Sequence, residues 1–183
     1  MKLSAPEAPT TAVSSPWVVR GTVQLFICPV RGVIPGNGDV MAQALRVAGQ
    51  GTAVLVVQFL KGGIHQGPDA IIHMGRDLEW VRCNLTRCID SPHLEPEEHQ
   101  AITELWHFTQ SAVASGRFGL VVLDELSLAI KFGFIPETEV LDLLHQRPSA
   151  MDVVITGQEM PDALLEVADL VTQVNLREQR SAA

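Results

Sequence analysis

The stretch Leu120-Val-Val-Leu-Asp124-Glu125 decides the fold class of this chain. Four consecutive apolar residues precede two carboxylates, so apolar and polar side chains do not alternate along it. A strand whose two faces are both covered by helices has this pattern, because its side chains must be apolar on either face. The stretch therefore predicts a buried strand, Phe118–Leu123, in a parallel sheet.

Further apolar runs bounded by turn-forming residues predict the other strands of the same sheet. They are Val23–Ile27, Ala53–Phe59, Leu78–Arg82, Asp152–Thr156 and Leu170–Val174. Between them lie helical patterns, three of which directly follow a proline, a residue typical of helix starts. These are Met41–Ala48, Glu97–Ser115, Glu137–His145 and Asp162–Ala168. Such alternation predicts right-handed crossovers, and hence an α/β domain with a doubly wound, mainly parallel sheet.

The helix predicted over Glu97–Ser115 has the clearest apolar face, with spacings of three and four residues. Its members are Ile102, Leu105, Trp106, Thr109 and Val113.

The length of 183 residues fits one domain with a core of its own. Residues 1–19 are rich in Ala, Pro, Ser and Thr and have no apolar period, so we expect a flexible arm there. We place the α/β domain at residues 20–176 and a disordered tail at 177–183.

The charge, the apolar runs and the cysteines of the chain argue against several kinds of binding partner and against a structural metal site. A net charge of −8 argues against a nucleic acid or an anionic membrane, which would require a basic face. The apolar runs are too short to cross a bilayer and the N-terminus lacks an export signal, so we expect a cytoplasmic protein. Cys28, Cys83 and Cys88 lack the second pair of a structural metal site, and we expect free thiols packed as small apolar groups.

Ligands of parallel α/β sheets bind beyond the carboxyl ends of the strands. At one such end, Asp124 and Glu125 have two interpretations. P-loop nucleotide-binding proteins place a metal-holding Asp and a catalytic or water-positioning Glu in this arrangement. Alternatively, Asp124 caps a helix that begins at Glu125, and the pattern alone does not decide between the two.

A P-loop site also requires a Gly-rich turn after the first strand that ends in Lys and Ser or Thr, because these residues bind the phosphates and Mg²⁺. From Val23 to Gly51 this chain contains no Lys, no Ser and no Thr. The turn Cys28–Gly38 instead contains two prolines and the apolar pair Val33 and Ile34. The usual phosphate-binding chemistry is therefore missing.

The residues that remain in this turn are the candidates for any ligand binding there. They are Arg31, Gly32, Gly36, Asn37 and Gly38. Arg31 could replace the lysine as a phosphate partner. In the other interpretation the glycines only keep a tight turn between strand and helix.

Several sequence blocks together resemble the ATP:corrinoid adenosyltransferases, in order from about Gly21 to Val174. The blocks are Ala44–Gly51, Val56–Gly63, Leu120–Leu126, Pro136–Leu141, Arg147–Pro148, Val154–Gly157 and Ala168–Thr172. The resemblance implies a P-loop NTPase-like (RecA-like) three-layer sandwich and a homodimer. It also implies transfer of the adenosyl group of ATP, with Mg²⁺, to the cobalt of a reduced corrinoid.

By position in the family, Asp124 and Glu125 would be the Mg²⁺ and active-site carboxylates. Arg46 would lie on the first helix behind the nucleotide, and Lys61 beside the cleft. ATP, Mg²⁺ and a corrinoid are implied only if the family's activity is retained.

The chain departs from the family where ligands would bind. The family's Gly-Asn-Gly-Lys-Gly-Lys-Thr-Thr loop is replaced, and its Gly-Phe-Thr-Trp segment has become Asn84–Asp90, with Trp80 in the preceding strand. The family's Thr-Gly-Arg has become Thr156-Gly-Gln158, and its C-terminal Val-Lys-His segment is absent.

Three hypotheses follow. The first is a non-catalytic binding or regulatory protein with an unidentified protein partner, and we favour it because the changes cluster at the cleft. The second is a working adenosyltransferase in which Arg31 and backbone N–H groups hold triphosphate. The third is an enzyme with different chemistry that uses Asp124, Glu125 and His65.

Overall fold

The computed structural model describes residues 20–29, 40–64 and 66–174. Its elements, in chain order, are β1 (Val23–Ile27), α1 (Val40–Gly49), β2 (Val54–Gln58), β3 (Ile72–His73), β4 (Leu78–Arg82), α2 (Pro96–Ala114), β5 (Leu120–Asp124), α3 (Leu126–Lys131), α4 (Glu137–Gln146), β6 (Asp152–Gly157), α5 (Asp162–Val167) and β7 (Leu170–Gln173). The arm predicted over residues 1–19 and the tail predicted over 177–183 lie outside the described residues.

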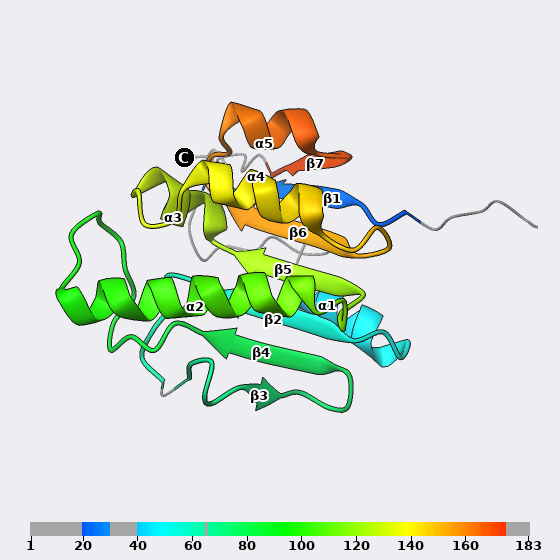
Figure 1. Cartoon of the computed structure of the whole chain (residues 1–183), viewed down its shortest axis with the longest axis horizontal. Helices are drawn as coiled ribbons and strands as arrows, with labels where there is room; N and C mark the ends of the chain where they lie inside the picture. Colours follow the sequence, from blue (N-terminus) through cyan, green and yellow to red (C-terminus); the bar gives the residue numbers. More distant parts are fainter. Residues whose placement is uncertain (1–19, 30–39, 65, 175–183) are drawn as a thin grey trace, which may run out of the picture.

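The described strands form one sheet in the order β3-β4-β2-β5-β6-β1-β7 (Figure 1). Every neighbouring pair is parallel except β3 and β4, which are antiparallel. The later strands β5 and β6 lie between β2 and β1, with β4 and β3 beyond β2 and β7 beyond β1. The prediction of a doubly wound, mainly parallel α/β fold is confirmed.

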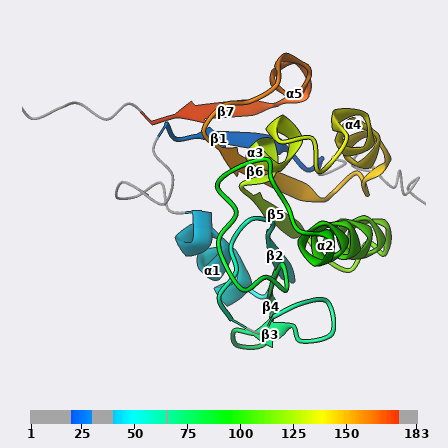
Figure 2. The ribbon, with the colours of Figure 1, turned by 90° about the vertical axis from the view of Figure 1, so that its left-hand side faces the viewer.

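Helices cover both faces of the sheet, which gives three layers (Figure 2). On one face, Val40 and Ala44 of α1 pack against Val54, Val56 and their neighbours on β4, β5 and β6. On the other face, buried residues of α2, α3, α4 and α5 form the larger core with the strands. Burial on both faces explains why β2 is apolar over four consecutive residues, as inferred for central strands.

Helix α2 confirms the helix prediction most closely. Pro96 occupies its first turn, and the Glu95 and Glu98 side chains form a reciprocal capping box with the backbone at the helix start. The five residues predicted to form its apolar face are all buried.

Two elements differ from the sequence prediction, and several boundaries shift by one or two residues. The two-residue strand β3 and the short helix α3 were not predicted, and β5 begins at Leu120 rather than at Phe118. Phe118 is buried in the core without being part of the strand, because burial alone does not require sheet pairing. Among the described helices, none is long and apolar enough to cross a membrane.

Candidate functional site

The carboxyl ends of β4, β2 and β5 lie side by side and carry a row of polar side chains. Gln58, the last residue of β2, is in register with Arg82 of β4 on one side and with Asp124 of β5 on the other. Val56 and Val122, two positions earlier, belong to the core that packs against α1. Since alternate residues of a strand point to the same face, the polar row lies on the α1 side of the sheet.

Asp124 is the centre of this row and accepts three hydrogen bonds. Its Oδ2 accepts from Gln58 Nε2 and from Lys61 Nζ, both at 2.7 Å, and its Oδ1 accepts from Thr156 Oγ1 at 2.7 Å. The Lys61 contact is an ion pair whose side chains are only 26% and 19% exposed, with Lys61 given first. We refer to Gln58, Lys61, Asp124 and Thr156 as the strand-end cluster.

Arg82 and Trp80 of β4 fix the orientation of the Gln58 amide. Gln58 Oε1 accepts from Arg82 Nε at 2.7 Å and from Trp80 Nε1 at 3.0 Å. The Arg82 guanidinium also lies 4.6 Å from the centre of the Trp80 ring, at cation–π distance. Because both donors hold the amide oxygen, the amide nitrogen is turned toward Asp124.

Lys61 is held by close packing between the loop after β2 and the segment after β4. A Cβ on Gly62 would lie 2.3 Å from the carbonyl oxygen of Arg87 and 2.6 Å from that of Leu85, so this approach requires glycine. Gly63 N donates to Leu85 O at 2.9 Å, and Ile89 N donates to Leu60 O at 2.9 Å. The segment after β4, which contains Leu85, Arg87 and Ile89, therefore braces the loop that carries Lys61.

Glu125 marks a sharp turn from β5 into α3. Within the described residues it is the non-glycine residue with positive φ, at 60°, and it is buried. Its backbone N donates to Thr156 Oγ1 at 2.9 Å, so one hydroxyl links Glu125 to Asp124. The capping interpretation of Asp124 is wrong, because α3 begins at Leu126 and the Asp124 carboxylate bonds to the cluster instead.

The end of β6 connects the cluster to the backbone that leaves β1. Cys28 N donates to Gly157 O at 2.9 Å, and Gln158 Nε2 donates to Pro29 O at 3.1 Å. The Gln158 amide therefore helps to hold this backbone in place.

The predicted site residues fall into three groups. Asp124, Glu125 and Lys61 are brought together at the strand ends, as expected. Arg46 is exposed on α1, and the hydrogen bonds of the described cluster do not include it. The remaining candidates lie outside the described residues: Arg31, Gly32, Gly36, Asn37, Gly38 and His65.

Gln58, Arg82 and Thr156 had not been assigned as site residues from the sequence. Gln58 and Arg82 each end a predominantly apolar strand with a hydrogen-bonding side chain, and Thr156 nearly ends another. A hydrogen-bonding side chain at the end of an apolar strand is the feature of the sequence that could have identified these residues as part of the site.

Asp124 is the position at which the family resemblance implies Mg²⁺, an ion that takes oxygen ligands in octahedral geometry. In the described structure its carboxylate accepts hydrogen bonds from an ammonium and two neutral donors. Over the described parts of the chain, no group of three or more His, Cys, Asp and Glu residues could hold a metal ion.

The cysteines differ from one another in their surroundings. Cys83 is buried, as expected for a packed thiol, and burial raises its pKa to about 12, so it remains protonated. The expectation of packing is wrong for Cys88, which is exposed.

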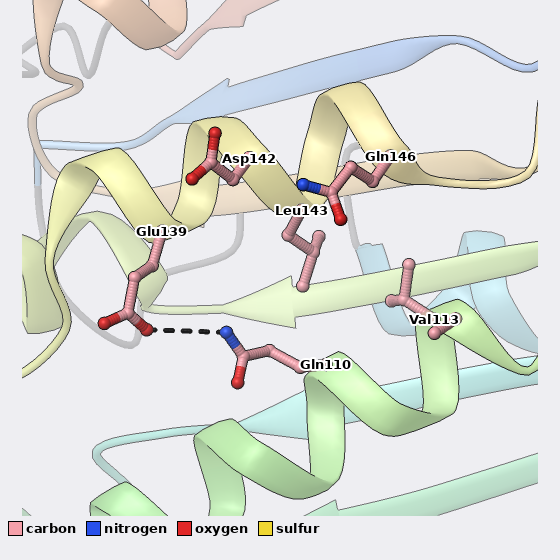
Figure 3. A pocket seen from close by; sticks show the side chains of 7 residues that line it. Gln110, Val113, Glu139, Asp142, Leu143 and Gln146 are labelled. Carbon is pink, nitrogen blue, oxygen red and sulfur yellow. Dashed lines mark hydrogen bonds between the residues drawn. The ribbon is translucent and has the colours of Figure 1, made fainter.

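A recess of about 330 Å³ lies elsewhere, between α2 and α4 (Figure 3). Gln110 and Val113 line it from α2, and Glu139, Asp142 and Gln146 from α4. Glu139 accepts from Trp106 Nε1 at 2.6 Å and from Gln110 Nε2 at 3.4 Å, so its carboxylate joins the two helices. The recess shares no residue with the strand-end cluster, which we take as the candidate site because of its place in the sheet.

Comparison with known proteins identifies the relatives of this chain. The family described as "ATP:corrinoid adenosyltransferase BtuR/CobO/CobP" matches residues 39–181. A corrinoid adenosyltransferase of Pseudomonas aeruginosa is 30% identical over 164 residues, which cover 80% of this chain and 76% of that protein. Another, from Escherichia coli K12, is 30% identical over 153 residues, covering 79% of this chain and 76% of the relative.

Proposed function

Because this chain belongs to the ATP:corrinoid adenosyltransferase family, we propose that it is a non-catalytic binding or regulatory member that no longer uses ATP. The fold and the order of the sequence blocks are those of the family, while the changes are concentrated at the strand ends. The proposal therefore concerns what this edge of the sheet can still bind.

The absence of phosphate-binding side chains after β1 carries the proposal. A triphosphate is usually held by backbone N–H groups together with a lysine and a Ser or Thr hydroxyl. No residue from Val23 to Gly51 is Lys, Ser or Thr, so this segment supplies neither the ammonium nor the hydroxyl. Pro29 and Pro35 further remove two backbone donors.

The competing function is an active adenosyltransferase with an altered loop. The retained carboxylates Asp124 and Glu125 and the similarity to named adenosyltransferases favour it. In that case Arg31 would have to replace the lysine, and phosphates usually need several charge-assisted donors.

Thermal melting with and without Mg-ATP separates the two functions. We expect no change in Tm at millimolar Mg-ATP, beyond that produced by Mg²⁺ and salt alone, because a ligand stabilises the folded protein only if it binds it. A rise in Tm that saturates with Mg-ATP and disappears in Arg31→Ala would establish the altered-loop enzyme instead.

A further inference from the structure

We infer that Arg82 is the anchor for an oxyanion, the carboxylate or phosphate group of a small ligand, at the carboxyl end of β4. The inference rests on the proposed binding function and names the chemistry that this edge of the sheet takes. The residues involved lie on β2, on β4 and in the loop after β2, outside the segment after β1.

Arg82 carries a positive charge that no described carboxylate neutralises. The side chain is half-buried, and it takes part in none of the ion pairs found in the described part of the chain. Its partners are Gln58 Oε1, the Gly62 carbonyl oxygen and the Trp80 ring, which are all neutral. Because a partly desolvated charge is unfavourable without a counter-charge, an anion at this position gains a strong partner.

The hydrogen bonds of Arg82 leave the fork of its guanidinium open. Its Nε donates to Gln58 Oε1 at 2.7 Å, whereas Nη1 reaches the Gly62 carbonyl only at 3.5 Å, and Nη2 makes no hydrogen bond within the described residues. Arg147 is the contrast, because its Nε, Nη1 and Nη2 all donate to backbone carbonyls. The fold therefore satisfies Arg147, while Arg82 keeps donors for a ligand.

The Arg82 guanidinium is also held in position by its surroundings. It lies 4.6 Å from the centre of the Trp80 ring, and Gln58 binds its Nε from the neighbouring strand. Gln58 is itself held by Trp80 Nε1 and by Asp124, whose charge is compensated by Lys61. A side chain that is already ordered loses little conformational entropy on binding, so these contacts lower the cost of binding an anion.

The class of ligand follows from the geometry of arginine. Two N–H groups of a guanidinium match two oxygens of a carboxylate or a phosphate. The chain contains an example in Arg117, whose Nη1 and Nη2 donate to the two Glu79 carboxylate oxygens, each at 2.7 Å. Arg82 offers such a fork at the carboxyl end of its strand, where ligands of parallel α/β sheets bind.

The test is a titration of the full chain, without nucleotide or divalent metal, with sodium phosphate and separately with sodium acetate at constant ionic strength. The readout is the nitrogen–proton NMR signal of each arginine Nε–H group. The Arg82 signal should shift and saturate with at least one anion, and the anion that binds more tightly identifies the group. The Arg147 signal should stay in place, because its nitrogens are already bonded.

Variants are compared through the Trp80 indole N–H signal. Arg82→Gln should bind the anion at least about tenfold more weakly, because it removes both the charge and the fork. Arg82→Lys keeps the charge without the fork, and its affinity should lie between the two. Arg76→Gln is the matched control: Arg76 is 93% exposed, and its loss changes the net charge equally, so binding should equal that of the wild type.

Two results would overturn the inference. One is an Arg82 signal in the wild type that saturates with neither anion, and this result requires no folded variant. The other is equal weakening by Arg82→Gln and Arg76→Gln, because binding would then follow the net charge alone. Failure of the proposed function has a different signature, namely stabilisation by Mg-ATP that depends on Arg31.

Discussion

The Asp124 carboxylate joins its own strand, β5, to two segments that are distant in sequence, namely the end of β2 with the loop after it and the end of β6. Its carboxylate is bonded to Gln58 at the end of β2, to Lys61 in the following loop and to Thr156 on β6. The single hydroxyl of Thr156 joins two neighbouring residues, because it donates to Asp124 and accepts from the backbone of Glu125. At the scale of single residues, Thr156 is therefore the position where a small change tests the cluster.

Thr156→Val should destabilise the protein by about 1–3 kcal/mol, because it leaves part-buried groups at Asp124 and Glu125 with one partner fewer. Urea unfolding at neutral pH measures the change. Thr103→Val is the matched control: Thr103 is half-buried on α2, and its hydroxyl donates to the His99 carbonyl in a solvent-exposed hydrogen bond. Its cost should stay within about 0.5 kcal/mol, and equal losses for the two variants would contradict the role given to Thr156.

At the scale of elements, α3 packs unusually closely on the end of β6. A Cβ added to Gly157 would lie 1.6 Å from Ser127 Oγ and 2.7 Å from Ser127 Cβ. Because Ser127 is buried in the first turn of α3, it cannot move away without moving the helix. This contact sets the position of the Glu125 turn, and hence of the strand-end cluster.

Gly157→Ala should cost at least about 1–3 kcal/mol, since it forces overpacking at this contact. The control is Gly49→Ala at the end of α1, where an added Cβ meets nothing within 4 Å. Unfolding in urea should show a loss for the first variant and none for the second. Ser127→Gly combined with Gly157→Ala should recover part of the loss, and no recovery would place the strain elsewhere.

The start of α2 is held by a charged clamp. Arg87 donates to both Glu98 oxygens at 2.8 Å, and Glu98 also accepts from the backbone N of Glu95 at 3.0 Å. The hydrogen bonds from Arg87, and to a lesser extent the one from the Glu95 backbone, hold the pKa of Glu98 below its ordinary value. The clamp connects the segment that braces Lys61 to the larger helical layer.

A lowered pKa gives the clamp a defined dependence on pH. The unfolded chain binds a proton at Glu98 more readily than the folded one, so the clamp's contribution is present above the ordinary pKa near 4.5. It is lost as the pH falls through the lower folded value. The stability difference between wild type and Glu98→Gln should therefore shrink as the pH is lowered from 7 toward 3.

Urea unfolding of both proteins across this pH range measures the difference. Glu97→Gln removes the same charge from the same turn without removing the Arg87 contact, and serves as the control. A difference for Glu98→Gln that stays constant with pH would contradict the clamp.

Most elements could be predicted because their sequences carry their own signals. The apolar run of β5 and the proline before α4 are readable without knowing the rest of the fold. Strand β3 has two residues, too few for a period, and its pairing with β4 depends on tertiary contact. Helix α3 follows β5 directly after Glu125, whose backbone has a left-handed conformation. Glycine is the usual residue in that conformation, so the sequence gives no indication of this turn.

The candidate site could be predicted only in part, for a related reason. Asp124 and Glu125 stand out because two carboxylates follow a buried strand. The hydrogen bonds of Gln58 with Arg82 and Asp124 depend on which strands are neighbours and in what register. A sequence alone does not give that register, because a shift of one residue turns every side chain to the other face.

At the scale of the whole molecule, the described residues form three layers, and polar side chains at the carboxyl ends of β2, β4, β5 and β6 are bonded to one another. Helices cover both faces of the sheet, and buried apolar side chains fill both interfaces. At the carboxyl ends of the strands, the ion pair between Lys61 and Asp124 belongs to this internal network.

Equilibrium dialysis of the wild-type chain against labelled ATP with Mg²⁺ tests the central claim most directly. The absence of any Lys, Ser or Thr from Val23 to Gly51 predicts no bound nucleotide above background at millimolar ATP. Binding that saturates at one nucleotide per chain would contradict the account.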